Sequence, residues 1–222
     1  MRVPISLTAE RRLVLALVLA SVATLALVGV RMAVVGSRGY GFLAWNLFLA
    51  WVPMGCAALA WRWRARHAGL LALALVGWLV FFPNAPYILT DLMHLRTTRG
   101  APLWLDVLVV GSAAATGLLL GLVSLHQVHD ALAARTRRPR LTWLAVGVVV
   151  YLGAIGVYLG RFHRWNTWDL LRKPDEILAD AWATLTEPRV LGFCALFGTA
   201  LGVAYLVYRL VVPPRTGTAT TP

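Results

Sequence analysis

The sequence predicts an all-α, polytopic membrane bundle of about six transmembrane helices, and three observations support this. Hydrophobic residues make up 59% of the chain and charged residues only 14%, with a mean hydropathy of +0.72. Apolar runs of roughly 20 residues, the length that crosses the hydrocarbon core of a bilayer, recur along the chain. The segments between them are mostly short and rich in Arg and Pro. This hydrophobic content is higher than a soluble domain of this length needs to build its one core, so the composition argues against a soluble protein.

The predicted spans belong to one transmembrane domain that covers residues 1–212. They lie at about residues 13–30, 42–61, 70–87, 103–125, 141–159 and 190–212. Residues 213–222 are rich in Pro and Thr without an apolar pattern, so we expect a disordered tail. Arg11 and Arg12 precede the first span, as they would in a signal peptide, but this apolar run is longer than the usual signal core. We therefore expect the first span to be retained.

Several function classes find no support in the sequence. The formal net charge is +12, but the Arg residues are scattered between apolar runs and form no basic arm, so we expect no nucleic-acid partner. Cys56 and Cys194 lie inside apolar runs and resemble small buried hydrophobes. The chain carries no nucleotide-binding glycine loop, Ser-His-Asp arrangement, paired-cysteine motif or haem attachment sequence. We expect no cofactor and no metal, and the sequence assigns neither a reaction nor an oligomeric state.

Orientation follows from the distribution of Arg between the short loops. The second and fourth loops contain most of these residues, namely Arg62, Arg64, Arg66, Arg135, Arg137, Arg138 and Arg140. These loops are predicted to be cytoplasmic, which places both chain ends inside and the third and fifth loops outside. The lipid bilayer is then the first partner of the chain.

The first outer segment, residues 82–95, follows the third span. Pro83 and Pro86 should break the helix, and the freed backbone groups then need partners such as the side chains of Asn84 and Thr90. Further along, Asp91 and His94 share one face of a helix at a spacing of three, close enough to share a proton or a ligand. We take these two as candidate catalytic residues, with Asn84 and Tyr87 as candidate substrate-binding residues.

The second outer segment, residues 158–169, joins Arg side chains to aromatic ones. Arg161 and Arg164 have planar guanidinium groups suited to phosphate or carboxylate, and aromatic residues favour the membrane interface. Together with Asn166 and Asp169, these residues form a candidate binding site for an anionic lipid headgroup. Residues 174–185 begin with Pro and carry one apolar face, which predicts a short helix on the bilayer surface.

The presence of these polar residues also has an alternative explanation, in which each has a purely structural role. Asp91 and Asp169 can neutralise Arg161 and Arg164, since unpaired charges near lipid are costly. Asp169 can cap the helix that starts at Asn166, and His94 can be an interfacial histidine without a ligand.

Other features favour structure over chemistry. His126 and His129, at the inner end of the fourth span, have too few partners nearby to indicate a metal site. Asp106 stands near a helix start, where negative charge is favourable. The GxxxG pairs Gly117–Gly121, Gly156–Gly160 and Gly198–Gly202 predict close packing of the last three spans.

The two outer segments resemble the DUF1361 family of bacterial multi-pass membrane proteins. The resemblance rests on Pro83-Asn84-Ala85-Pro86-Tyr87, Thr90-Asp91-Leu92, His94, Gly160-Arg161, Arg164-Trp165-Asn166 and Trp168-Asp169. It implies a bacterial cytoplasmic (inner) membrane and a six-helix plan, and it brings no established activity or cofactor. Family members usually have an aliphatic residue in the place of His163, which argues against a metal site there.

Three functions agree with these patterns. The first is an outward-facing site for an anionic lipid headgroup or a lipid-linked intermediate. The second is a small transporter or channel that uses the broken third helix and Asp106, since discontinuous helices often mark solute sites. The third is a non-catalytic membrane subunit whose charged motifs stabilise the fold. Few polar residues apart from Asn46 lie near the centres of the spans, which weakens the second.

Overall fold

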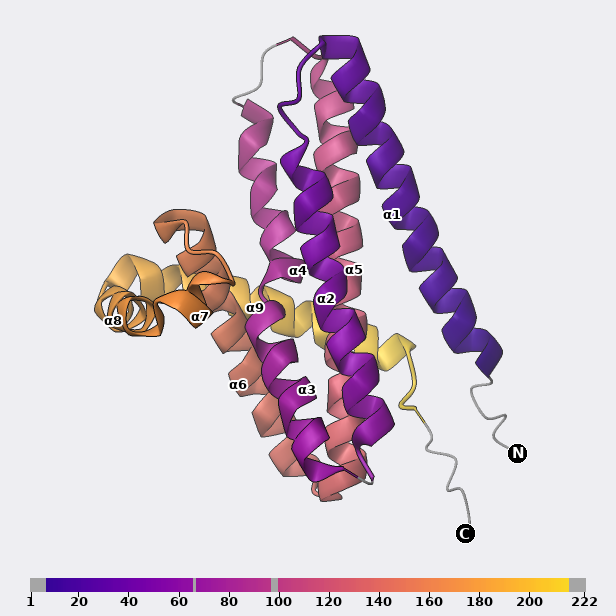
Figure 1. Cartoon of the computed structure of the whole chain (residues 1–222), viewed down its shortest axis with the longest axis vertical. Coiled ribbons are helices and arrows are strands. Elements are labelled where there is room, and N and C mark those ends of the chain that lie inside the picture. The colour runs from indigo at the N-terminus through magenta and orange to yellow at the C-terminus, as the bar shows by residue number, and fades with distance from the viewer. Residues whose placement is uncertain (1–6, 66, 97–99, 216–222) are drawn as a thin grey trace.

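The chain folds into an all-helical bundle. The computed structural model describes residues 7–65, 67–96 and 100–215, and all of its regular elements in these ranges are helices (Figure 1). Six segments are long and apolar enough to cross a membrane. They are Glu10–Val35, Phe42–Trp63, Ala68–Leu95, Leu103–Thr136, Pro139–His163 and Pro188–Val211. This confirms the predicted fold class, a polytopic membrane bundle.

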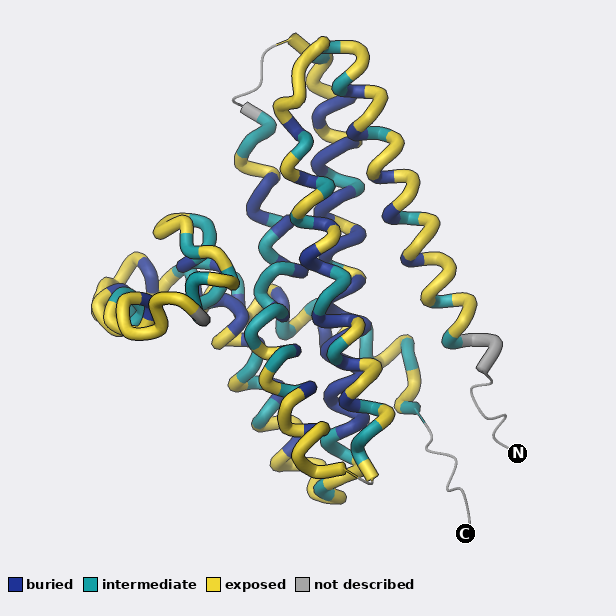
Figure 2. The backbone as a smooth tube through the Cα atoms, in the orientation of Figure 1, coloured by how far each residue is buried: buried dark blue, intermediate teal, exposed yellow. Residues whose placement is uncertain are grey.

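The first, second, fourth and sixth of these segments are single helices. They are α1 (Leu7–Val35), α2 (Phe42–Trp63), α5 (Leu103–Thr136) and α9 (Pro188–Val211). Buried residues follow α5 along its whole length, whereas α1 and α9 expose many large hydrophobic side chains (Figure 2). α5 is therefore the central helix, and the outer helices present surfaces suited to lipid.

The third span is broken at the two prolines, as the sequence predicts. α3 (Ala68–Phe81) gives way to the single turn α4 (Asn84–Tyr87) and then to the tighter helix η1 (Ile88–Arg96). The Asn84 side chain donates a hydrogen bond of 2.9 Å to the Phe81 carbonyl, which is one of the groups that the break leaves without a helical partner.

Glycines of α5 and α6 lie where these two helices pack against the break in the third span. α6 (Pro139–Tyr158) continues into one wide turn, η2 (Leu159–His163). A Cβ atom on Gly117 of α5 would lie 2.8 Å from the Ala85 carbonyl, and a Cβ atom on Gly156 of α6 would lie 2.6 Å from the Pro83 ring. The expectation that these glycines bring the last three spans together is therefore wrong for α5 and α6, where they admit the third span. Gly198 of α9 does meet α6, at Tyr151.

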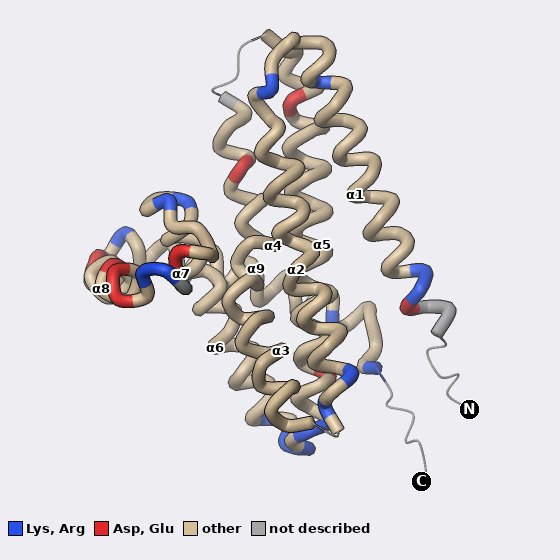
Figure 3. Tube along the Cα trace, viewed as in Figure 1, with Lys and Arg blue, Asp and Glu red and all other residues tan. Residues whose placement is uncertain are grey.

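Side-chain contacts sort the helix ends into two faces. On one face, Arg215 near the C-terminal end binds Glu10 of α1 and lies over Trp61 of α2, while Arg135 of α5 donates to the Arg64 carbonyl. We call this the basic face. On the opposite face, Arg31 of α1 meets Asp106 of α5, and the η2 turn meets η1. Figure 3 shows the charged residues gathered toward the helix ends.

Two short helices of the fifth connection complete the opposite face. They are α7 (Asp169–Arg172) and α8 (Pro174–Leu185). In α8, Ile177 is buried against the protein, whereas Leu178 and Trp182 are 65% and 77% exposed. The predicted helix is therefore present, with its apolar side chains divided between the protein and the exposed side, and its place on the bilayer surface stays a prediction.

Several boundaries differ from the sequence prediction, among them those of α1, which covers Leu7–Val35 instead of about residues 13–30. α5 continues to Thr136 instead of ending near residue 125, because residues 126–130 are buried and find polar partners on α9. At the start of the expected disordered tail, the Arg215 backbone N–H donates to Asp130 at 2.7 Å and its side chain binds Glu10. The remainder of that tail, residues 216–222, lies outside the described residues.

Substituting Ala for Gly156 tests the glycine contact between α6 and the broken span. The added methyl group would overlap the Pro83 ring, so we expect a loss of about 1–3 kcal/mol in the free energy of unfolding, measured in detergent micelles. Gly147→Ala, on the same helix, is the control because nothing lies within 4 Å of a Cβ atom there. Equal stability of the two variants would show that this packing is not tight.

Candidate functional site

Asp91 is the centre of the polar cluster on the opposite face. Its side chain is 1% exposed, and both carboxylate oxygens are occupied. One oxygen forms an ion pair with the Arg161 guanidinium group, and the other accepts a hydrogen bond of 3.1 Å from the Asn46 side chain. The carboxylate thus connects η1 to η2 and to α2. A charge buried at this depth needs such partners.

Arg161 is held on three sides by residues of the third span. Besides its ion pair with Asp91, its Nε donates to the Thr90 hydroxyl at 2.7 Å, and its guanidinium carbon lies 4.3 Å from the centre of the Tyr87 ring. Thr90 in turn donates to the Tyr87 carbonyl at 2.6 Å. The arginine side chain is 12% exposed, so most of its surface contacts protein. The predicted binding residues Tyr87 and Arg161 therefore contact each other.

His94 lies at the solvent edge of the same cluster. Its Nδ1 atom is 3.6 Å from the Asp91 carboxylate and 3.2 Å from the Asp91 carbonyl, and its side chain is 38% exposed. The two candidate catalytic residues are thus neighbours, as their spacing predicts. The buried carboxylate is saturated, whereas the imidazole can be reached from outside.

Asn84 belongs to a neighbouring polar contact. Its side-chain amide and the Thr167 hydroxyl form hydrogen bonds of 2.9 and 3.3 Å. Beside them, the Phe81 and Trp168 rings meet edge to face with their centres 5.6 Å apart. These contacts join the break in the third span to the loop that follows η2.

Arg164, Asn166 and Asp169 do not join the Asp91 cluster. The Asp169 carboxylate accepts a hydrogen bond of 2.8 Å from the Asn166 backbone N–H, as their spacing predicts. The helix begins at Asp169 and not at Asn166, so the prediction that Asn166 is its N-cap is wrong. The alternative pairing of Asp169 with Arg164 is not formed. Arg164 is exposed, has a left-handed backbone with φ of 62°, and enters none of the ion pairs between described residues.

A third contact holds α8 to the η2 turn. Asp180 of α8 accepts a hydrogen bond of 2.8 Å from the Trp165 indole and lies 3.3 Å from Nδ1 of His163. The other ring nitrogen of His163 is 3.3 Å from the Thr184 hydroxyl. The Trp165 hydrogen bond, and after it the one from His163, lowers the pKa of Asp180 below 3.8, its ordinary value.

Two further ion clusters were not predicted from the sequence. Arg31 binds Asp106 at 3.0 Å, both side chains are 2% exposed, and Tyr40 stacks on the guanidinium group at 4.2 Å. Asp106 is thus an ion-pair partner as well as a helix-start residue. The sequence signal for this pair was a charged residue inside an apolar run. Its two members are 75 residues apart, so the sequence could not show that they contact each other.

The other cluster lies at the basic face. Asp130 accepts a hydrogen bond from Arg209 at 2.6 Å and lies 3.3 Å from Nε2 of His126, while His129 contacts the Tyr205 hydroxyl at 2.7 Å. The histidines of the fourth span therefore have polar partners that sequence spacing could not indicate. Within the described ranges, no three His, Cys, Asp or Glu side chains stand close enough to hold a metal ion.

These features define a class: a multi-pass α-helical membrane protein with a buried Asp–Arg pair beneath one face. A family model described as "Protein of unknown function (DUF1361)" matches residues 45–203. The chain therefore belongs to the DUF1361 family, as the outer segments suggested. No curated protein and no solved structure matches it.

Removing one member of the Asp91–Arg161 pair should be costly. Asp91→Asn leaves a mostly buried guanidinium group without its counter-charge, so we expect a loss of about 3–5 kcal/mol in unfolding free energy. Asp169→Asn is the control and should cost about 1 kcal/mol, because it weakens only the hydrogen bond from the Asn166 backbone N–H. In a double-mutant cycle, Arg161→Gln added to Asp91→Asn should cost little more than either single change. Additive losses would contradict the pairing.

The lowered pKa of Asp180 predicts an acid-sensitive contact between α8 and η2. The ionised carboxylate stabilises the folded loop above its ordinary pKa, and this contribution is lost as the pH falls through the lower folded-state pKa. We therefore expect lower protection of the α8 amides, measured as the exchange rate relative to the intrinsic rate at the same pH, at about pH 3 than at about pH 6. Asp180→Asn should already exchange fast at the higher pH. If the variant and the natural protein behave alike throughout, the carboxylate has no such role.

Proposed function

We propose that the protein binds an anionic lipid headgroup, or a lipid-linked intermediate with a phosphate, at its opposite face. The observation that carries this proposal is the contrast between the two arginines of the η2 segment. Arg161 is mostly buried and paired with Asp91. Arg164, three residues later, is exposed and forms no ion pair with another described residue. The first can hold the turn in place, and the second is available to an anion.

The surroundings of Arg164 suit a headgroup at the membrane interface. Arg172 is exposed at the end of the adjacent α7 and adds positive charge, whereas the charge of Lys173 after it is paired with Glu176 at 3.0 Å. Exposed aromatic side chains lie in the same connection, with Trp168 at 38% and Trp182 at 77%. Tryptophan favours the level of lipid headgroups, so these rings support a position at the bilayer boundary.

Within this proposal the candidate residues have separate roles. Asp91, Arg161, Thr90 and Tyr87 fix η2 against η1, and the Asn84–Thr167 contact fixes the following loop. Asn166 and Asp169 shape the turn that presents Arg164. His94, which stands at the outer edge of the Asp91 cluster, is the group placed to exchange protons with a bound headgroup.

A solute path through the broken third span receives less support. Transporters that use discontinuous helices need the freed backbone to line a cavity. Here Phe82, Ala85 and Ile88 are completely buried, and the glycines of α5 and α6 pack directly against the break. Asp106, the other residue that such a path would use, is buried in its pair with Arg31.

We also infer that the basic face is cytoplasmic, in the inner membrane of a bacterium. Exposed Arg137, Arg138 and Arg140 crowd its shortest connection, as cytoplasmic loops do. Arg215 and Glu10, which lie near the two ends of the described chain, contact each other at this face. The headgroup site would then face the outer leaflet.

Hydrogen exchange in nanodiscs can test the headgroup site. We expect phosphatidylglycerol, compared with phosphatidylcholine, to slow the exchange of backbone amides in residues 160–173. Arg164→Gln should weaken this protection about fivefold, because one arginine at an anionic surface contributes roughly that factor. The matched control is Arg38→Gln, which removes an exposed arginine from the connection between α1 and α2. Protection that survives Arg164→Gln would exclude the proposed site.

A further inference from the structure

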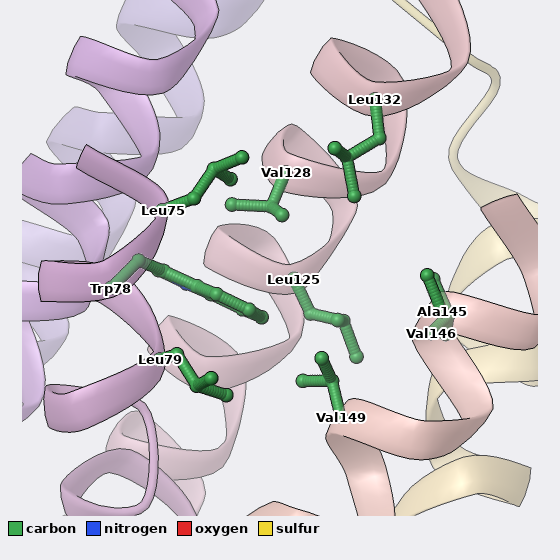
Figure 4. Close-up of a pocket in the computed structure, with 9 residues that line it drawn as sticks. All are labelled: Leu75, Trp78, Leu79, Leu125, Val128, Leu132, Ala145, Val146 and Val149. Atoms are coloured by element: carbon green, nitrogen blue, oxygen red, sulfur yellow. The ribbon is translucent and has the colours of Figure 1, made fainter. Parts of the chain in front are cut away.

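An apolar groove lies between α3 and α6, with α5 as its floor. It encloses a cavity of about 130 Å³, and all nine side chains that line it are hydrophobic (Figure 4). Trp78 and Leu79 form one wall, Val146 and Val149 form the other, and Leu125 lies between them. Leu79 is 37% exposed, so the groove is accessible from the surface of the bundle.

The groove opens toward the basic face. At its other end, Gly153 and Gly156 of α6 admit Phe82 and Pro83, which brings α6 against the break in the third span. On the basic side, Leu132 lines the groove three residues before Arg135, and Ala145 lines it five residues after Arg140. At about 1.5 Å per residue, these linings end roughly 5–8 Å along the helices from the arginines.

Four exposed arginines surround this mouth, at the connection between α5 and α6. They are Arg135, Arg137, Arg138 and Arg140. The connection is also rigid. Thr136 accepts a hydrogen bond of 3.3 Å from the Arg138 backbone N–H, and Thr142 donates one of 3.0 Å to the Arg138 carbonyl. The first turn of α6 adds the partial positive charge of a helix N-terminus.

We propose that this groove and its arginine turn form a binding site for an anionic phospholipid of the leaflet at the basic face. One acyl chain lies in the groove, because the groove is wholly apolar and opens between membrane-spanning helices. The phosphate lies among the arginines, whose charge complements it at the depth of the headgroups. Basic residues beside a cleft between transmembrane helices are the chemistry that anionic lipids require. This site is independent of the headgroup site on the opposite face.

Neither the groove nor the arginines alone would select an anionic phospholipid. An apolar groove accepts the chain of any phospholipid, and exposed arginines attract any anion. The groove and the arginines are close enough along α5 and α6 for one lipid molecule to contact both. The affinity for a lipid whose chain lies in the groove then depends on the charge of its headgroup. The site should therefore prefer phosphatidylglycerol over phosphatidylcholine with the same chains, and it should not retain glycerol phosphate.

Native mass spectrometry of the full-length protein in detergent tests this preference with those three probes. We expect phosphatidylglycerol to remain bound more strongly than phosphatidylcholine. Arg138→Gln together with Arg140→Gln should weaken phosphatidylglycerol about thirtyfold. The control pair, Arg11→Gln with Arg12→Gln, removes two exposed arginines elsewhere on the basic face and should retain it. These arginines are all exposed, so the fold should tolerate both pairs.

A second pair of variants tests the groove. Ala145→Phe places a ring in the cavity and should displace the lipid, whereas Ala195→Phe adds the same ring to an exposed position of α9 and should not. Equal retention of the two phospholipids, retention of glycerol phosphate, or unchanged binding in Arg138→Gln/Arg140→Gln would overturn the proposal. So would unchanged binding in a folded Ala145→Phe. Arg164→Gln, which removes the opposite-face site, should lower only the number of phosphatidylglycerol molecules retained there, and the further losses caused by Arg138→Gln/Arg140→Gln and by Ala145→Phe should remain the same in its presence.

Discussion

The buried carboxylate of Asp91 is the constraint on which the half of the bundle at the opposite face depends. An ionised side chain inside a membrane-spanning segment is tolerated only with a counter-charge and hydrogen-bond donors. Its partners come from two other spans, Asn46 of α2 and Arg161 of η2. Satisfying one charge thus holds three helices at a common level. The ion pair also fixes where α6 gives way to the turn that presents Arg164.

A second constraint brings the partners within reach. The prolines of the third span break its helix, and a broken backbone in a membrane must be enclosed by protein. Gly117 and Gly156 leave room for this enclosure, because any larger residue would collide with Ala85, Ile88 or Pro83. The close approach places η1 beside η2 on the opposite face. Beyond the contact, toward the basic face, the gap between α3 and α6 becomes the apolar groove (Figure 4).

The arginines of this protein fall into two groups with different physical roles. Arg31 and Arg161 are buried and bind carboxylates, so their charge is used within the fold. Arg164 and the arginines of the α5–α6 connection are exposed at the two faces of the molecule. Exposed guanidinium groups at the level of lipid phosphates attract anions, whereas paired ones do not. Both lipid sites that we propose rest on this separation, and in these proposals the groove adds chain recognition to only one of them.

The sequence by itself determined the class, the six spans, the broken third helix, the short helix α8 and the contact between Asn166 and Asp169, because hydropathy, proline and short polar spacings act over a few residues. It also indicated that Asp91 and His94 are neighbours. The tertiary structure decided which charges meet. Asp91 and Arg161 are 70 residues apart and Arg31 and Asp106 are 75 apart, so local spacing could not join them. Nor could it show that Asp169 leaves Arg164 exposed, or that α9 supplies partners to His126 and Asp130. Ion pairing depends on which helices pack against each other in the bundle, and the periodicity of residues along the chain does not indicate which helices are neighbours.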